Sequence, residues 1–253
     1  MVRILAAAAA ALLLVLASRA ARAQEYVVIE SSVPSLALGA TVPAGATLAV
    51  PAKGRVVLVN ANGQVTTITG PYQGAPPTAP AGAGGGTAPG SNDVVKLFAT
   101  LMGSGGQRQA LGAVRGTDAA WRQETVHTLA DVLAINVTDG GDVCLYDANH
   151  ATVTHDPAHD GTMSIEDMSG GGKARLQWPK DTTQLPWPAA LPLTDGGNYL
   201  FEQQGAGDAT VAVIHLLQAD GGVSEIARAA QMAKAGCADQ ARLLLALVAR
   251  SAK

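Results

Sequence analysis

The chain has 253 residues, of which 48% are hydrophobic and 15% are charged, and its formal net charge is -3. This length can supply a hydrophobic core and more than one small domain. The mildly acidic balance argues against a nucleic-acid partner, which requires a basic stripe, and it gives no reason to expect adhesion to an anionic membrane.

Residues 1–23 have the pattern of a secretory signal peptide. Arg3 supplies the positive charge, residues 4–17 form the apolar region, and a small-x-small cleavage site ends at Ala23, before Gln24. The apolar region is too short for a comfortable membrane span, so we expect cleavage and no integral membrane segment afterwards. Cleavage removes three arginines and no acid, which lowers the net charge from -3 to -6. Because the composition is typical of a high-GC bacterium, we expect a periplasmic or secreted protein.

Residues 24–72 are predicted to form a small β roll or sandwich. Runs rich in β-branched residues at 26–29, 55–59 and 65–69 are typical of strands. Residues 60–63, between the last two runs, are a hairpin signal because Asn and Gly tolerate positive φ. Short strands with glycine at the corners indicate a small all-β module.

Residues 73–92 are rich in Gly, Ala and Pro and carry no charge. Such a sequence buries too little apolar surface to offset the entropy of ordering. It is therefore predicted to be a flexible linker, or a long excursion within one domain. Residues 93–122 follow as a short helical connector, in which Val94, Phe98 and Leu101 fall on one helix face.

Residues 123–218 are predicted to form an Ig-like β-sandwich, opened by a strand at 133–137. Turn signals separate its short apolar runs, although the Cys-Trp-Cys framework of antibody domains is absent. Residues 219–253 are predicted to form a C-terminal helical hairpin with its corner at Gly236. We expect the hairpin to pack its apolar faces on the second β module, and the fold class is mainly β.

The two cysteines, Cys144 and Cys237, leave two alternatives open. In an oxidising compartment they can form a disulfide, which over so long a loop stabilises by roughly 4–5 kcal/mol in the chain-entropy model. In the other alternative both are buried thiols that pack as small hydrophobes. Neither cysteine belongs to a CxxC pair, so a redox or zinc role is not expected.

One segment carries side chains that could bind a metal ion. Its candidate ligands are His150, His155, His159, Asp156 and Asp160. Imidazoles and carboxylates are the ligands of zinc, but Pro157 and Gly161 disfavour the helix that would align two of these histidines. The alternative is a polar loop between two strands, which we favour. We therefore assign no metal, no catalytic residue and no cofactor.

Trp178 and Trp187 are each followed by proline and are expected at strand ends. The two rings could line a carbohydrate platform. The favoured alternative is that they cover the end of the sandwich core.

The glycines of residues 36–71 stand at the corners of short strands, in a spaced series. They are Gly39, Gly45, Gly54, Gly63 and Gly70. In this series the segment resembles the FecR-type periplasmic domain. The resemblance implies a β structure that receives a signal from a partner and passes it toward a sigma-factor system, and it implies no catalytic residue. No cytoplasmic region precedes the signal-peptide pattern, so we expect the fold and a binding role without the complete anti-sigma function.

These patterns predict a non-enzymatic periplasmic protein that binds another envelope protein or envelope component, in signalling or assembly. One alternative is an exported metal-dependent hydrolase that uses His150, His155 and His159. Another is a carbohydrate- or peptidoglycan-binding module that uses Trp178 and Trp187.

Overall fold

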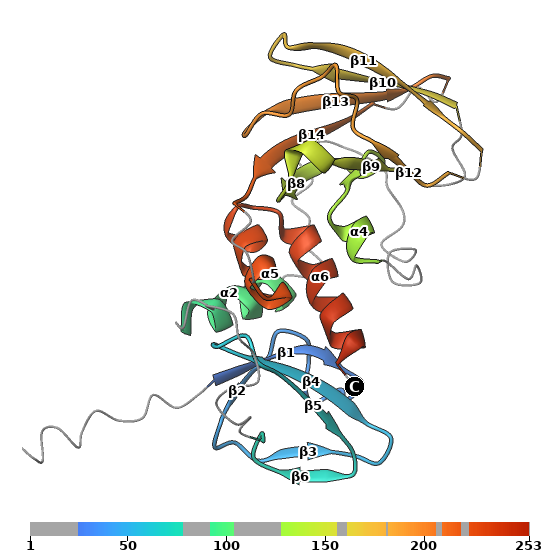
Figure 1. Cartoon of the computed structure of the whole chain (residues 1–253). Helices are drawn as coiled ribbons and strands as arrows, with labels where there is room; N and C mark the ends of the chain where they lie inside the picture. The colour runs from blue at the N-terminus through green and yellow to red at the C-terminus, as the bar shows by residue number, and fades with distance from the viewer. Residues whose placement is uncertain are drawn as a thin grey trace, which may run out of the picture.

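The protein is mainly β, with several sheets and a pair of C-terminal helices, as its sequence predicts. In the computed structural model the helices lie between two β modules (Figure 1). The described residues are 25–77, 92–103, 128–155, 161–180, 182–205, 209–218 and 223–252. No helix among them has the length and apolar character needed to cross a bilayer. The predicted signal peptide, residues 1–23, lies outside the described residues.

The first β module is built on a four-stranded sheet with the strand order β2-β1-β4-β5. The four strands are β1 Glu25–Ser31, β2 Thr41–Pro43, β4 Arg55–Asn60 and β5 Val65–Thr69. A smaller sheet pairs β3 Leu48–Val50 with β6 Tyr72–Gly74. The predicted turn joins β4 to β5: the Asn60 side chain accepts hydrogen bonds from the backbone of Asn62 (2.9 Å) and Gln64 (3.0 Å), and Gly63 has a φ of 73°.

Both faces of the inner strands β1 and β4 are buried. Side chains on one face pack in a core with β3 and β6; they include Tyr26, Val28, Val56 and Leu58. Side chains on the other face join a second core formed with the helices; they are Val27, Ile29, Val57 and Val59. The uninterrupted apolar runs in these strands therefore reflect a sheet that is covered on both sides.

Three helices cover the second face of this sheet. They are α2 Asn92–Gly103, α5 Glu225–Lys234 and α6 Ala238–Ser251. Helices α2 and α6 contact β1, and α5 packs along both of them. As predicted, Val94, Phe98 and Leu101 of α2 are buried together. Gly236, with a φ of 98°, lies at the corner of the helical hairpin.

Two predictions about this part of the chain need correction. The hairpin packs on both β modules, and not on the second alone, because α6 covers the helix-facing side of β1. The predicted linker, 73–92, begins too early, since Tyr72 pairs with Val50 and β6 continues to Gly74. This pairing uses main-chain hydrogen bonds, which composition does not reveal. Residues 78–91, and residues 104–122 of the predicted connector, lie outside the described residues.

The second β module contains a five-stranded sheet, β11-β10-β13-β14-β8, and a three-stranded sheet, β12-β9-β7. Both sheets contribute to one hydrophobic core, which gives a sandwich-like arrangement. The strands are β7 Ile135–Asn136, β8 Gly141–Leu145, β9 Thr152–Thr154, β10 Gly161–Asp167, β11 Gly172–Trp178, β12 Gln184–Pro186, β13 Asn198–Gln203 and β14 Ala209–Leu216. Two strand pairs, β14–β8 and β7–β9, are parallel, whereas immunoglobulin sandwiches consist of antiparallel sheets.

A short helix, α4 Leu129–Val132, precedes the first strand of this module. The Thr128 side chain accepts a hydrogen bond from the backbone N–H of Asp131, and the Asp131 carboxylate accepts one from the backbone N–H of Thr128. This reciprocal cap starts the helix. The predicted strand at 133–137 is therefore confined to β7, because the residues before it complete a helical turn.

Candidate functional site

Within the described residues, the predicted metal ligands do not converge. His150 is exposed, and its Nδ1 lies 2.6 Å from Asp147 Oδ2; this hydrogen bond lowers the pKa of the Asp147 carboxyl. His155 is only 8% exposed, and its ring lies edge-on to that of Trp178, with centroids 3.9 Å apart. The remaining candidates, Asp156, His159 and Asp160, lie outside the described residues. The rest of the described chain contains no group of three or more potential ligands.

Of the two tryptophans, Trp178 belongs to the core of the second β module and Trp187 packs against it. Trp178 is 3% exposed, and its Nε1 donates to the carbonyl oxygen of Thr182 (2.5 Å). Trp187 donates in the same way to Leu191 (2.5 Å), and its ring lies edge-on to Tyr199, with centroids 5.2 Å apart. The rings therefore cover core residues, which is the alternative that the sequence favours.

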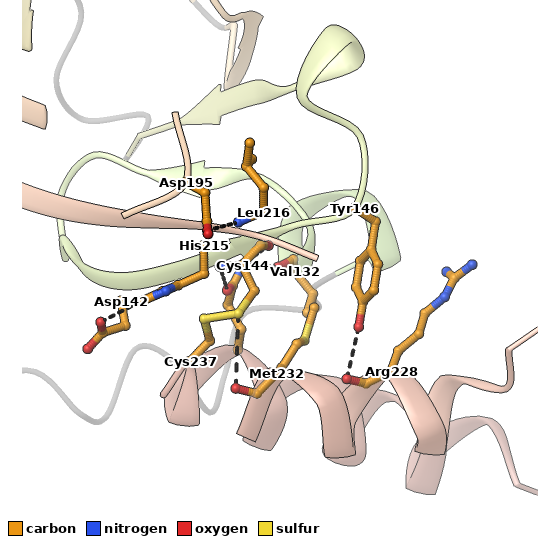
Figure 2. Close-up of a disulfide and its surroundings, with 11 residues drawn as sticks. Val132, Asp142, Cys144, Tyr146, Asp195, His215, Leu216, Arg228, Met232 and Cys237 are labelled. Atoms are coloured by element: carbon orange, nitrogen blue, oxygen red, sulfur yellow. Dashed lines mark hydrogen bonds and ion pairs between the residues drawn. A yellow bond between two sulfur atoms is a disulfide. The ribbon is translucent and has the colours of Figure 1, made fainter. Parts of the chain in front are cut away.

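Cys144 and Cys237 form a disulfide, with their Cα atoms 5.9 Å apart. The sequence left open whether the two cysteines form a disulfide or remain buried thiols, and the structure contains the disulfide. Both residues are fully buried, and the bond joins β8 to the residue before α6 (Figure 2). It therefore attaches the second β module to the helices.

Strand β8 is the seam between two hydrophobic cores. Val143 and Leu145 belong to the core of the second β module, whereas Cys144, between them, belongs to the core that contains the helices. The buried side chain of Gln240 accepts a hydrogen bond from Cys144 N (2.6 Å) and donates to the carbonyl oxygens of Val132 (2.9 Å) and Cys144 (3.4 Å). One amide thus satisfies both main-chain groups of Cys144, as a neighbouring strand would.

Polar contacts on either side of the disulfide strengthen this seam (Figure 2). The Tyr146 hydroxyl donates to the Arg228 carbonyl oxygen (3.0 Å), and the Arg228 guanidinium lies 5.5 Å from the centre of the Tyr146 ring. Burial raises the pKa of Tyr146 to about 12, so the phenol stays protonated as a donor. On the other side, His215 Nε2 lies 2.8 Å from Asp142 Oδ1. The seam is therefore a structural joint, held by the disulfide and by these polar contacts.

The outer face of the five-stranded sheet is the surface that this joint leaves uncovered. We define it by the side chains of Leu200, Val211, Val213, Glu166, Glu202, Lys173 and Arg175. Burial alternates along β10 and β13, so the neighbours of these residues, such as Ile165 and Phe201, point into the core. Strand register places Val211 beside Leu200, and Glu166 between Leu200 and Lys173. The outer face is consequently apolar at β14 and charged at β11.

The charged half of the outer face is organised around Lys173. Its Nζ lies 3.1 Å from Glu166 and 3.6 Å from Glu202, and the hydrogen bond with Glu166 raises the pKa of the ammonium. The apolar half includes Val211, which is 39% exposed. The solvated face of an antiparallel sheet ordinarily carries polar residues, whereas exposed apolar side chains beside charged ones are typical of an interaction site.

Sequence reasoning missed the outer face because both sides of β14 carry apolar residues. Ala212 and Ile214 point inward, while Val211 and Val213 point outward, so the strand is a continuous apolar run. The continuous apolar run could have indicated apolar residues on the outer face, but it equally predicts a strand that is buried on both sides. Comparison with known protein families, with curated proteins and with solved structures finds no match to this chain.

Proposed function

We propose that this protein is a non-enzymatic binding protein of the bacterial envelope, which contacts another envelope protein or envelope component through its outer face. The observation that carries the proposal is the group formed by Leu200, Val211 and Val213 beside the charges of Glu166 and Lys173. Apolar side chains buried in a contact supply much of its binding energy, and neighbouring charged side chains favour a partner of complementary charge.

The disulfide supports the proposed location. Disulfides persist in oxidising compartments such as the bacterial periplasm, and this is the destination expected from the pattern of residues 1–23. The proposal includes the resemblance of the first module to a FecR-type domain, beside a second module whose sandwich differs from that of immunoglobulins by two parallel strand pairs. A FecR-like role would consist of receiving a signal from a partner and passing it on, and the disulfide that joins the second module to the helices would couple the two modules.

A photo-crosslinking amino acid at position 211 of the full chain tests the proposal. In cells, we expect it to form one dominant adduct with an envelope partner. The control carries the same amino acid at position 149, which is also exposed but lies outside the outer face. Adducts of equal yield at both positions, or none at position 211, would contradict the proposal.

A substitution then measures the contribution of the outer face. With the partner identified, Val211→Glu should weaken its binding by about tenfold or more, because a charge replaces an apolar contact. Asn149→Glu adds the same charge elsewhere and should leave the dissociation constant unchanged. Urea unfolding of both variants shows whether the fold is intact.

A further inference from the structure

Strand β11 is the open edge of the five-stranded sheet. At the opposite edge, β8 is closed, because Gln240 bonds to the main chain of Cys144. Among the described residues, no strand or side chain pairs with the main chain on the outer side of β11, which lies away from the helices (Figure 1). An unpaired edge of seven residues can pair with an extended segment of another chain.

The hydrogen bonds of β10 show which main-chain groups of β11 face the open edge. Near both ends of β10, even-numbered residues bond to the β13 side: Met168 N donates to the Asn198 carbonyl oxygen (2.9 Å), and Gln204 N donates to that of Thr162 (2.9 Å). Hydrogen-bonded pairs alternate along an antiparallel ladder, so the odd-numbered residues of β10 bond to β11, where their partners are even-numbered. The main-chain groups of the odd-numbered β11 residues therefore point to the open edge.

Three residues thus offer main-chain donors and acceptors at this edge: Lys173, Arg175 and Gln177. All three are exposed. The residues between them, Ala174 and Leu176, are half-buried and pack against the core of the second β module. Side chains alternate between the two faces of a sheet, so an added strand would set one series of side chains beside the charges and the other beside apolar groups.

The charge of β11 favours an acidic strand. Its two charged residues, Lys173 and Arg175, are both positive, and Arg175 has no ion-pair partner among the described residues. Opposite charges across a strand pair stabilise it, and like charges destabilise it. In the symmetric registers centred on Ala174 or Arg175, a second copy of β11 would place its own Lys173 or Arg175 opposite Arg175. The edge therefore disfavours pairing with itself and matches a segment with carboxylates at alternate positions.

We propose that the partner binds by strand addition: an extended acidic segment of an envelope protein joins the five-stranded sheet at β11. The inference rests on the proposed function, because Lys173 and Arg175 also belong to the outer face. Main-chain hydrogen bonds to the odd-numbered residues of β11 supply affinity, and the alternate side chains supply selectivity. Carboxylates of the segment lie beside Arg175, and its apolar side chains extend the core beyond Leu176.

A synthetic peptide of about seven residues, in which Glu and Val alternate, tests the charge preference. The control peptide carries Lys in place of Glu. We expect the protein to bind the Glu peptide about tenfold more tightly than the Lys peptide, because the Glu side chains lie opposite Lys173 and Arg175. Arg175→Glu should reduce or reverse this preference. Fluorescence anisotropy of the labelled peptides measures the dissociation constants.

A proline at the edge tests the main-chain bonds. Gln177→Pro removes an N–H that points away from β10, so the pairing of β11 with β10 keeps its hydrogen bonds. This variant should bind the Glu peptide about fivefold more weakly. Gln177→Ala loses the same side chain but keeps the N–H, and it should bind as the native protein does. Urea unfolding shows whether both variants are folded.

Amide hydrogen exchange distinguishes strand addition from contact through side chains alone. With the Glu peptide at about ten times its dissociation constant, exchange at Lys173, Arg175 and Gln177 should slow by about tenfold. The amides of Ala174 and Leu176 already bond to β10 and should change little. Binding without this alternation would overturn the inference.

The remaining outcomes separate strand addition from the proposed function. A crosslinked adduct at position 211 in cells, together with no binding of the Glu peptide, would overturn strand addition and leave the outer face as the binding surface. Peptide binding without an adduct at position 211 would overturn the role of the outer face and support the open edge. A dimer of this chain that Gln177→Pro abolishes would overturn the inference, because the strand would then come from a second copy.

Discussion

Single polar side chains satisfy main-chain groups that are buried among apolar residues. Gln240 is an example: it lies on α6, is 9% exposed, and supplies a donor and an acceptor to the main chain of Cys144. A carboxylate could only accept, and an apolar side chain would leave both groups unsatisfied. In the sequence, Gln240 is one polar residue among several on an amphipathic helix, so its role could not be predicted.

A second such residue, Asp167, holds the turn between β10 and β11. Its Oδ1 accepts hydrogen bonds from the Ser169 hydroxyl (2.6 Å) and from Ser169 N (2.8 Å), and these bonds lower the pKa of the carboxyl below its ordinary value. A lowered pKa in the folded state means that the ionised form contributes stability above the ordinary pKa. This contribution is lost as the pH falls through the lowered value.

We therefore predict that Ser169→Ala reduces stability at neutral pH and that the difference from the native protein shrinks in acid. The measurement is the free energy of unfolding in urea, followed from neutral pH down to about pH 2. Ser169→Thr keeps a hydroxyl and should retain most of the native stability. A difference that stays constant over the whole range would show that the Asp167 carboxyl is not the cause.

At the scale of the elements, the end of α6 is bound by a residue far from it in sequence. Arg55, on β4, donates from Nη2 to the carbonyl oxygens of Ala249 (2.8 Å) and Ala252 (2.7 Å), and it also pairs with Glu30. A guanidinium at a helix C-terminus binds free carbonyl groups and interacts favourably with the helix dipole. Arg55 thus fixes the end of α6 to the first β module.

Arg55→Met should lower the free energy of unfolding by about 1–3 kcal/mol, because two carbonyl groups and Glu30 lose a charged partner. Arg55→Lys should recover only part of this loss, since an ammonium does not reproduce the planar fork of the guanidinium. The control is Arg250→Met, which removes an exposed arginine from the last turn of the same helix and should cost less than about 0.5 kcal/mol. Equal losses for Arg55→Met and Arg250→Met would contradict the proposed role.

Most individual elements could be predicted from local patterns, because those patterns reflect local physics. The β4–β5 hairpin follows from Asn and Gly at its turn, and α2 follows from the spacing of Val94, Phe98 and Leu101. The short helix α4 was missed although Thr128 and Asp131 carry its capping signature. The outer face was not predicted, since only the strand register brings Val211 beside Leu200.

At the scale of the whole molecule, the sequence suggested two β modules joined by a linker, with a hairpin attached to the second. The structure instead places α2, α5 and α6 in one core with the first β module, so this module does not end before the Gly-rich segment. Such contacts join residues far apart in the chain, and composition shifts along the sequence do not report them. The disulfide between Cys144 and Cys237 likewise required the three-dimensional distance.

This arrangement makes a prediction about the protein cut within residues 78–91. With a site-specific protease sequence placed there, the two fragments should elute together in gel filtration after cleavage, because the helices still cover Val27, Ile29, Val57 and Val59. The midpoint of their urea unfolding should become dependent on protein concentration, as expected for association. Fragments that separate in native buffer would show that the two modules are independent.

The side of the first sheet that the helices cover is partly exposed while the chain is being synthesised, because strands and helices emerge at different times. Strands β1 and β4 come first, whereas α5 and α6, which cover Val27 and Val57, come last. Until these last two helices are released, α2 can cover only part of this apolar surface, and the remainder is open to aggregation. We therefore expect the incomplete chain to aggregate more readily than the complete one, in which the last turn of α6 is bound by Arg55.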